Sequence, residues 1–122
     1  MKINIKATGI ELTVAISEYA HKKIHKLERF LGNNPEAVAK VEVGKSTQHH
    51  KSGEIFRAEV HITGVGVNIY ESSEQSDLYA AIDVVEDKVT NALIQKKGKR
   101  ESLTRRSARR IKDTLRKWYP FS

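Results

Sequence analysis

The chain has no cysteine among its 122 residues, only two prolines and a single tryptophan. The absence of cysteine excludes disulfide bonds and thiolate metal sites, and it implies no particular redox compartment. No apolar run approaches the ~18 residues that a membrane-spanning helix requires, and Met1 leads directly into a strand pattern where a signal peptide would have an apolar segment. We therefore expect a cytoplasmic protein with no membrane partner.

Charge is divided unevenly along a composition that is otherwise ordinary for one soluble domain. Residues 1–95 contain 11 Lys or Arg and 13 Asp or Glu, a net charge of −2, whereas residues 96–122 contain 11 and 2, a net charge of +9. This asymmetry indicates a polyanionic partner, with nucleic acid the first candidate. The alternative is a tail that only increases solubility.

Four stretches alternate between apolar and polar residues and predict strands. They are residues 2–8, 38–47, 54–63 and 67–72. Short turns between the last three favour an antiparallel meander, whereas the long connection after the first favours a parallel, right-handed crossover.

Two further stretches carry apolar residues at helical spacing. The first lies between an expected N-cap at Thr13 and an expected end at Gly32, and the second lies between Ser76 and Gly98. Because each strand offers only one apolar face, both helices should pack on the same side of the sheet. The predicted fold class is α+β, in the order β-α-β-β-β-α, with a four-stranded mixed sheet and a basic C-terminal extension. The predicted core stripes are Ile16, Ala20, Ile24, Leu27 and Leu31, then Leu78, Ile82, Val85, Val89 and Leu93.

The predicted elements and the uneven charge divide the chain into a domain, residues 1–98, and an extension, residues 99–122. Apolar residues recur at helical spacing from Ile111 to Trp118, but the stripe is short and its neighbours are like charges. The extension is therefore expected to be either helical or disordered. The aromatic residues that close it can stack on unpaired bases or anchor the tail on the protein's own surface.

Basic residues also line the predicted helices. Lys22, Lys26 and Arg29 are four and three residues apart, with Lys23 at their flank, and Lys88 lies on the second helix. If the helices lie side by side, these residues can form one cationic surface. The alternative is that they only solvate exposed helix faces.

The same residues carry a family resemblance. The run DLYAAID at residues 77–83, the following pair Asp87-Lys88, and the segment Lys26-Leu27-Glu28 resemble the ribosome hibernation-promoting factor family, also called ribosome-associated inhibitors. The resemblance covers roughly residues 1–100. It implies the same β-α-β-β-β-α fold, which is related in shape to double-stranded RNA-binding domains.

The resemblance also implies a function. Members of this family bind the small ribosomal subunit in the channel used by messenger RNA and transfer RNA, block translation by occupancy and protect idle ribosomes. No catalysis, cofactor, metal or small-molecule substrate is needed, and the protein would be a monomer on the ribosome. By motif position, the implied RNA-binding residues are Lys22, Lys23, Lys26, Arg29, Asp77, Tyr79 and Lys88. The charge pattern adds Lys96, Lys97, Lys99, Arg100, Arg105, Arg106, Arg109 and Arg110.

At two positions the chain departs from this family pattern. Asn91 and Gln95 stand where relatives usually carry Arg and Lys. The cations of the basic extension can compensate for these two missing positive charges. Long members of the family continue into a second domain that pairs ribosomes, for which this sequence leaves no room, so we do not expect ribosome dimerisation by that route.

Other chemistry is less well supported by the residues. His21 and His25 have a spacing that permits metal binding, but Lys22 stands where the zinc-protease pattern requires Glu.

Two alternative functions remain, a protein-interaction regulatory module and a general RNA-binding protein. The first would use the outer sheet face of Arg57, Glu59, His61, Asn68 and Tyr70.

Overall fold

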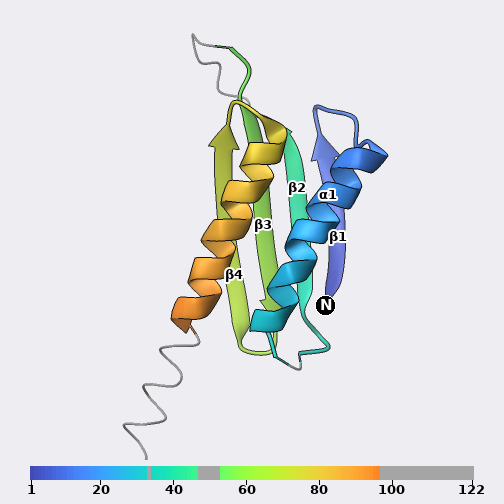
Figure 1. Cartoon of the computed structure of the whole chain (residues 1–122). Helices are drawn as coiled ribbons and strands as arrows, with labels where there is room; N and C mark the ends of the chain where they lie inside the picture. The colour runs from blue at the N-terminus through green and yellow to red at the C-terminus, as the bar shows by residue number, and fades with distance from the viewer. Residues whose placement is uncertain (33, 47–52, 97–122) are drawn as a thin grey trace, which may run out of the picture.

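A computed structural model describes residues 1–32, 34–46 and 53–96. The elements are β1 (Lys2–Thr8), α1 (Val14–His25), the 3-10 helix η1 (Lys26–Phe30), β2 (Val38–Lys45), β3 (Phe56–Gly64) and β4 (Val67–Gln75). A final helix over residues 78–96, which we call the second helix, follows β4. The predicted order β-α-β-β-β-α is confirmed (Figure 1). None of the helices described here is long and apolar enough to cross a membrane.

The four strands form one sheet in the order β1-β2-β3-β4. β1 pairs with β2 in parallel, and the other two pairs are antiparallel, as the lengths of the connections predicted. In this register Val41 is the partner of both Ile5 and Val60, so apolar side chains of neighbouring strands share one face. The register is well determined because a slip of one residue would turn these side chains to the solvent.

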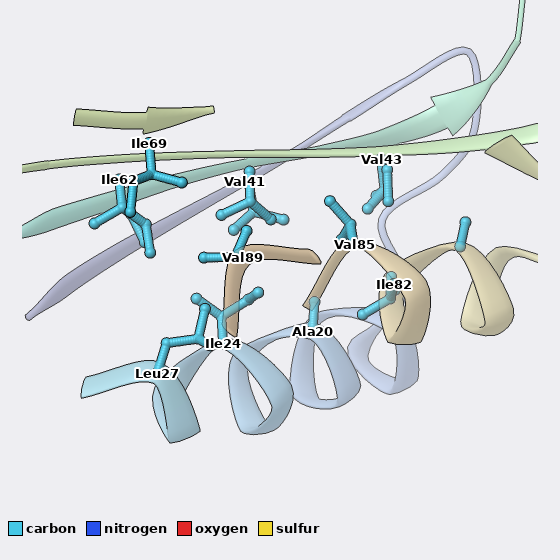
Figure 2. Close-up of a cluster of buried hydrophobic side chains, with 14 of the residues drawn as sticks. Ala20, Ile24, Leu27, Val41, Val43, Ile62, Ile69, Ile82, Val85 and Val89 are labelled. Atoms are coloured by element: carbon cyan, nitrogen blue, oxygen red, sulfur yellow. The ribbon is translucent and has the colours of Figure 1, made fainter. Parts of the chain in front are cut away.

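Both helices cover that apolar face, lying side by side and running in the same direction (Figure 1). Their buried stripes point at the sheet, as Figure 2 shows for Ile24 of α1 and Val89 of the second helix, which lie below Val41 in that view. These three side chains are buried, and the second helix's predicted stripe is buried along its whole length. The single apolar face of the sheet thus explains why both helices lie on the same side.

The helix ends differ in two respects from the prediction. The first helix is α-helical only to His25 and continues as η1, since 3-10 turns often finish an α-helix. The second helix is capped by Asp77 and not by Ser76, because Asp77 Oδ2 accepts the Ala80 backbone N–H at 3.0 Å. Ser and Asp are comparable caps, so the sequence could not choose between adjacent candidates. The expected C-cap, Gly98, lies outside the described residues.

The observed ends of two strands also differ slightly from the predicted ends. β3 begins at Phe56, two residues later than predicted, and β4 continues to Gln75, three residues further than predicted. The extra length of β4 comes from the ladder in which Gln75 is the partner of Phe56. Backbone pairing extended a strand whose last residues lack an alternating apolar pattern.

Candidate nucleic-acid interface

Three exposed cations follow the last turn of α1 into η1. They are Lys22, Lys26 and Arg29, which we call the basic row. The change to 3-10 geometry preserves the row, because three residues per turn bring Lys26 and Arg29 to the same side. Within the described ranges, no carboxylate pairs with any of the three at salt-bridge distance. Their charges are therefore available to a polyanion.

Lys23, at the flank of this row, is engaged between the two helices. Its Nζ lies 3.4 Å from Asp83 Oδ1 of the second helix and 5.6 Å from the centre of the Tyr19 ring. Tyr19 also donates its hydroxyl hydrogen to Asp83. The contact with Asp83 raises the pKa of Lys23 above its usual value. Lys23 therefore links the helices, and its charge is partly neutralised.

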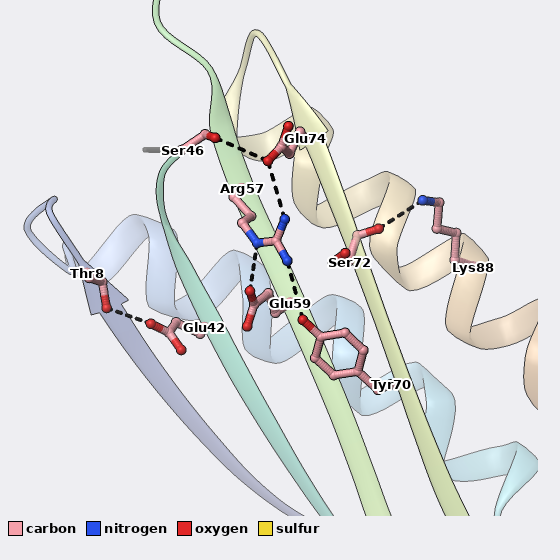
Figure 3. A network of polar contacts seen from close by, with 9 residues as sticks. All are labelled: Thr8, Glu42, Ser46, Arg57, Glu59, Tyr70, Ser72, Glu74 and Lys88. Atoms are coloured by element: carbon pink, nitrogen blue, oxygen red, sulfur yellow. Dashed lines mark hydrogen bonds and ion pairs between the residues drawn. The ribbon is translucent and has the colours of Figure 1, made fainter. Parts of the chain in front are cut away.

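Lys88 lies away from the basic row. Its Nζ donates to the Ser72 carbonyl oxygen of β4 at 2.8 Å, on the sheet's outer edge (Figure 3). At about 100° per residue, Lys88 is about 140° around the second helix from Asp83, which faces α1. The expectation that Lys88 and the basic row form one continuous cationic surface is therefore wrong.

Lys96 instead extends the basic row. It is the last described residue of the second helix, and it lines a hollow of about 480 Å³ together with Arg29. Apolar side chains from both helix ends, among them Phe30 and Leu93, also line this hollow. Cations from two elements far apart in the sequence thus converge where the basic C-terminal segment begins.

Carboxylates face α1 from the second helix, a feature that sequence analysis missed. Glu86 lies one turn beyond Asp83, and its partial burial, followed by the nearby Asp87, raises the pKa of the Glu86 carboxyl. Lys23 and Lys26 act in the opposite direction and lower that pKa. The surface between the helices is therefore mixed in charge. The signal was the spacing of Tyr79, Asp83 and Glu86, which places them beside the core stripe.

Replacing Glu86 by Gln should strengthen binding to a polyanion, because Lys23 and Lys26 lose a competing negative charge.

The Glu86→Gln replacement should also leave the free energy of unfolding at pH 7 equal or slightly higher. The raised pKa means that stability is full while Glu86 is protonated and falls as pH rises through that pKa. Urea unfolding at pH 4 and pH 7 measures this, with the exposed Glu36→Gln as the control. Lower stability of Glu86→Gln at pH 7 would contradict this prediction, because it would show that ionised Glu86 stabilises the fold.

The DLYAAID run at residues 77–83 has structural roles. Asp77 caps the second helix, while Leu78, Ala81 and Ile82 are buried. The Tyr79 ring packs edge-on against Tyr19, with centroids 4.9 Å apart. Asp77 and Tyr79 therefore lie at the start of the second helix, at the opposite end from Lys96. The predicted RNA-binding residues of the domain do not form one cluster.

The remaining predicted site residues lie outside the described residues. They are Lys97, Lys99, Arg100, Arg105, Arg106, Arg109 and Arg110. In the described part of the chain, no group of three His, Cys, Asp or Glu residues is arranged to hold a metal ion. His21 and His25 stack with ring centroids 6.4 Å apart.

Comparison with known proteins agrees with this fold. The profile of the family described as Sigma 54 modulation protein / S30EA ribosomal protein matches residues 3–101. The ribosome hibernation promoting factor of Klebsiella oxytoca is 33% identical over 99 residues, which are 81% of this chain and 96% of that protein. The ribosome hibernation promotion factor of Lactococcus lactis is 32% identical over 73% of this chain, but the match spans only 45% of that longer protein.

Solved structures give the same result. The N-terminal domain of Thermus thermophilus Protein Y is 31% identical, with a TM-score of 0.65 over 76% of this chain and 96% of that domain. A ribosomal subunit interface protein from Coxiella burnetii shares the fold, with a TM-score of 0.67 at 17% identity over 80% of this chain and 99% of that one. The match to the family profile, the identities to its members and the shared fold together place this chain in the Sigma 54 modulation protein / S30EA ribosomal protein family.

Proposed function

We propose that this protein is a cytoplasmic ribosome hibernation factor that binds the small ribosomal subunit in the messenger and transfer RNA channel. It inhibits translation by occupancy, without catalysis, and acts as a monomer. The observation that carries this proposal is the basic row, three exposed cations with no described carboxylate at salt-bridge distance. The hibernation-promoting function named for relatives such as the Klebsiella oxytoca protein supports it.

In this proposal, binding energy comes mainly from ribosomal RNA phosphates. Each phosphate neutralised by Lys or Arg releases condensed counterions, so the observed binding constant falls as salt rises. Because Glu86 offsets part of the positive charge of Lys23 and Lys26, we expect the most favourable potential on the exposed side of α1 and at the hollow that Arg29 and Lys96 line. The RNA backbone should follow that path toward the basic C-terminal segment.

Sedimentation with purified small subunits tests this function. The protein should pellet with the subunits at low salt, dissociate steeply as salt rises, and be displaced by messenger RNA or by initiator transfer RNA. Equal affinity for an unrelated structured RNA would indicate a general RNA-binding protein. Binding that neither RNA displaces would contradict placement in the channel.

Truncation after Gly98 tests the proposed role of residues 99–122 as a second, electrostatic anchor. It removes nine Lys or Arg and two Asp or Glu, a net charge of +7. The truncated chain should bind subunits more weakly. Its plot of log binding constant against log salt should be shallower by about 0.7–0.9 for each phosphate that the truncated chain no longer neutralises. Unchanged affinity and slope would show that these residues do not anchor the protein.

A further inference from the structure

The face of the sheet that the helices leave uncovered carries a hollow of its own. This sheet hollow has a volume of about 370 Å³, and its lining includes Asn4 and Lys6 of β1, Lys40 of β2, His61 of β3 and Tyr70 of β4. Ligand sites have volumes of about 300–1,000 Å³, so this is the size of a small site. It lies on the opposite side of the sheet from the basic row and can be occupied independently.

Two aromatic rings are held at one side of the sheet hollow. Tyr70 has a large aromatic side chain of the kind usually buried, yet it is 54% exposed. Its hydroxyl accepts a hydrogen bond from Arg57 Nη2 at 3.4 Å, and its ring lies edge-on to His61 at 6.1 Å between centroids. His61 Nε2 is in turn 2.7 Å from Asn68 Oδ1. A fixed, exposed ring of this kind is a platform on which a nucleic-acid base can stack.

Glu42 and Glu59 also line the sheet hollow, and both carboxylates are engaged, with Glu59 on the same Arg57 guanidinium that contacts Tyr70 (Figure 3). Glu42 Oε1 accepts the Thr8 hydroxyl hydrogen at 2.7 Å, and Glu59 Oε1 accepts from Arg57 Nε at 2.6 Å.

Lys6 and Lys40 remain as the cations of the sheet hollow. In the part of the chain that the structure describes, neither has a carboxylate at salt-bridge distance. The hollow therefore combines free positive charge with an exposed ring.

From this arrangement we propose that the sheet hollow binds one unpaired nucleotide of a single-stranded nucleic acid. The base stacks on Tyr70 beside His61, the phosphate meets Lys6 and Lys40, and the Asn4 amide hydrogen-bonds the base or sugar. A protein partner fits this face less well, because the cores of protein interfaces are depleted of charged residues and this face carries them throughout. The two lysines suit the phosphate of a nucleotide, and the exposed Tyr70 ring suits its base.

NMR titration of the full-length, 15N-labelled chain with hexaadenylate tests this proposal. The backbone signals of Lys40, His61 and Tyr70 should shift. Tyr70→Ala should weaken the interaction measured at these signals roughly 5- to 150-fold, the effect of losing one base–aromatic stack. Tyr70→Phe, which keeps the ring and removes only the contact with Arg57, should bind nearly as well as the parent.

The outcomes also separate this site from the basic row. Charge reversal of the basic row should leave the hexaadenylate shifts at Tyr70 in place, even if it abolishes binding to ribosomal subunits. Shifts confined to the basic row and to residues beyond 96 would overturn the proposal, as would equal affinity of Tyr70→Ala and the parent. Equal shifts with hexaglutamate would show that the hollow recognises charge alone, and an effect of Tyr70→Ala only on intact subunits would overturn the binding of a single-stranded nucleotide at this face.

Discussion

The triple variant Lys22→Glu, Lys26→Glu, Arg29→Glu should lose at least about 100-fold in affinity for purified small subunits. A cation–phosphate contact at about 4 Å in water is worth about 1 kcal/mol, so three contacts amount to about 3 kcal/mol, or roughly 150-fold. Reversed charges add repulsion. The fold should be unaffected, because all three side chains are exposed and none pairs with a described carboxylate. Sedimentation at a series of salt concentrations measures the loss.

Lys26→Glu and Lys88→Glu form a matched pair for this prediction. Both replace an exposed helix lysine with the same residue, but only Lys26 belongs to the basic row. Lys88 bonds a carbonyl at the edge of β4 on the other flank of the second helix. Lys26→Glu should therefore weaken binding clearly more than Lys88→Glu. Equal losses would mean that net charge alone decides affinity, and full binding by the triple variant would remove the basic row as the site.

Replacing Ile82 by Ala should lower the free energy of unfolding by about 2–5 kcal/mol, because it removes buried methyl groups and leaves a cavity. Ile82 is fully buried and belongs to the layer between the second helix and the sheet (Figure 2). This is a large share of the roughly 5–15 kcal/mol that stabilise a domain. Because Ile82 adjoins Asp83, the contacts with Tyr19 and Lys23 should loosen as well. Urea unfolding followed by circular dichroism measures the change.

Ile94→Ala is the matched control for this effect. Ile94 lies on the same helix, but its side chain is 49% exposed. The same atoms are removed in both variants, so the difference between them isolates burial from helix propensity. Ile94→Ala should lower the free energy of unfolding only slightly, since Ala is the better helix former. A similar cost in both variants would contradict the packing described here.

Much of the fold was predictable because its signals are local. Alternation over residues 2–8 gave the bounds of β1 as observed, and helical spacing identified Val85 and Val89 as core. One apolar face per strand was enough to place both helices on the same side of the sheet. Less local features were missed, such as the last residues of β4, which pair with β3 without an apolar pattern.

The candidate site was predicted less completely, because its charges act across elements. Sequence spacing identified the basic row, since its members lie on one helical stretch. It could not show that Lys23 is paired with Asp83, 60 positions further along the chain, or that Lys88 turns to the β4 edge. A cation's availability depends on which carboxylates the fold brings near it. That information is absent from spacing along one element.

The amino-acid sequence by itself determined the order of elements, the core stripes and the excess of positive charge after residue 95, because each depends on periodicity or composition. The tertiary structure alone decided which charges remain free. Parallel packing of the helices set Asp83 and Glu86 against α1, and convergence of the helix ends placed Lys96 beside Arg29. The physical reason is that electrostatic interactions depend on distance in space, and distances between separate elements arise only when the core assembles.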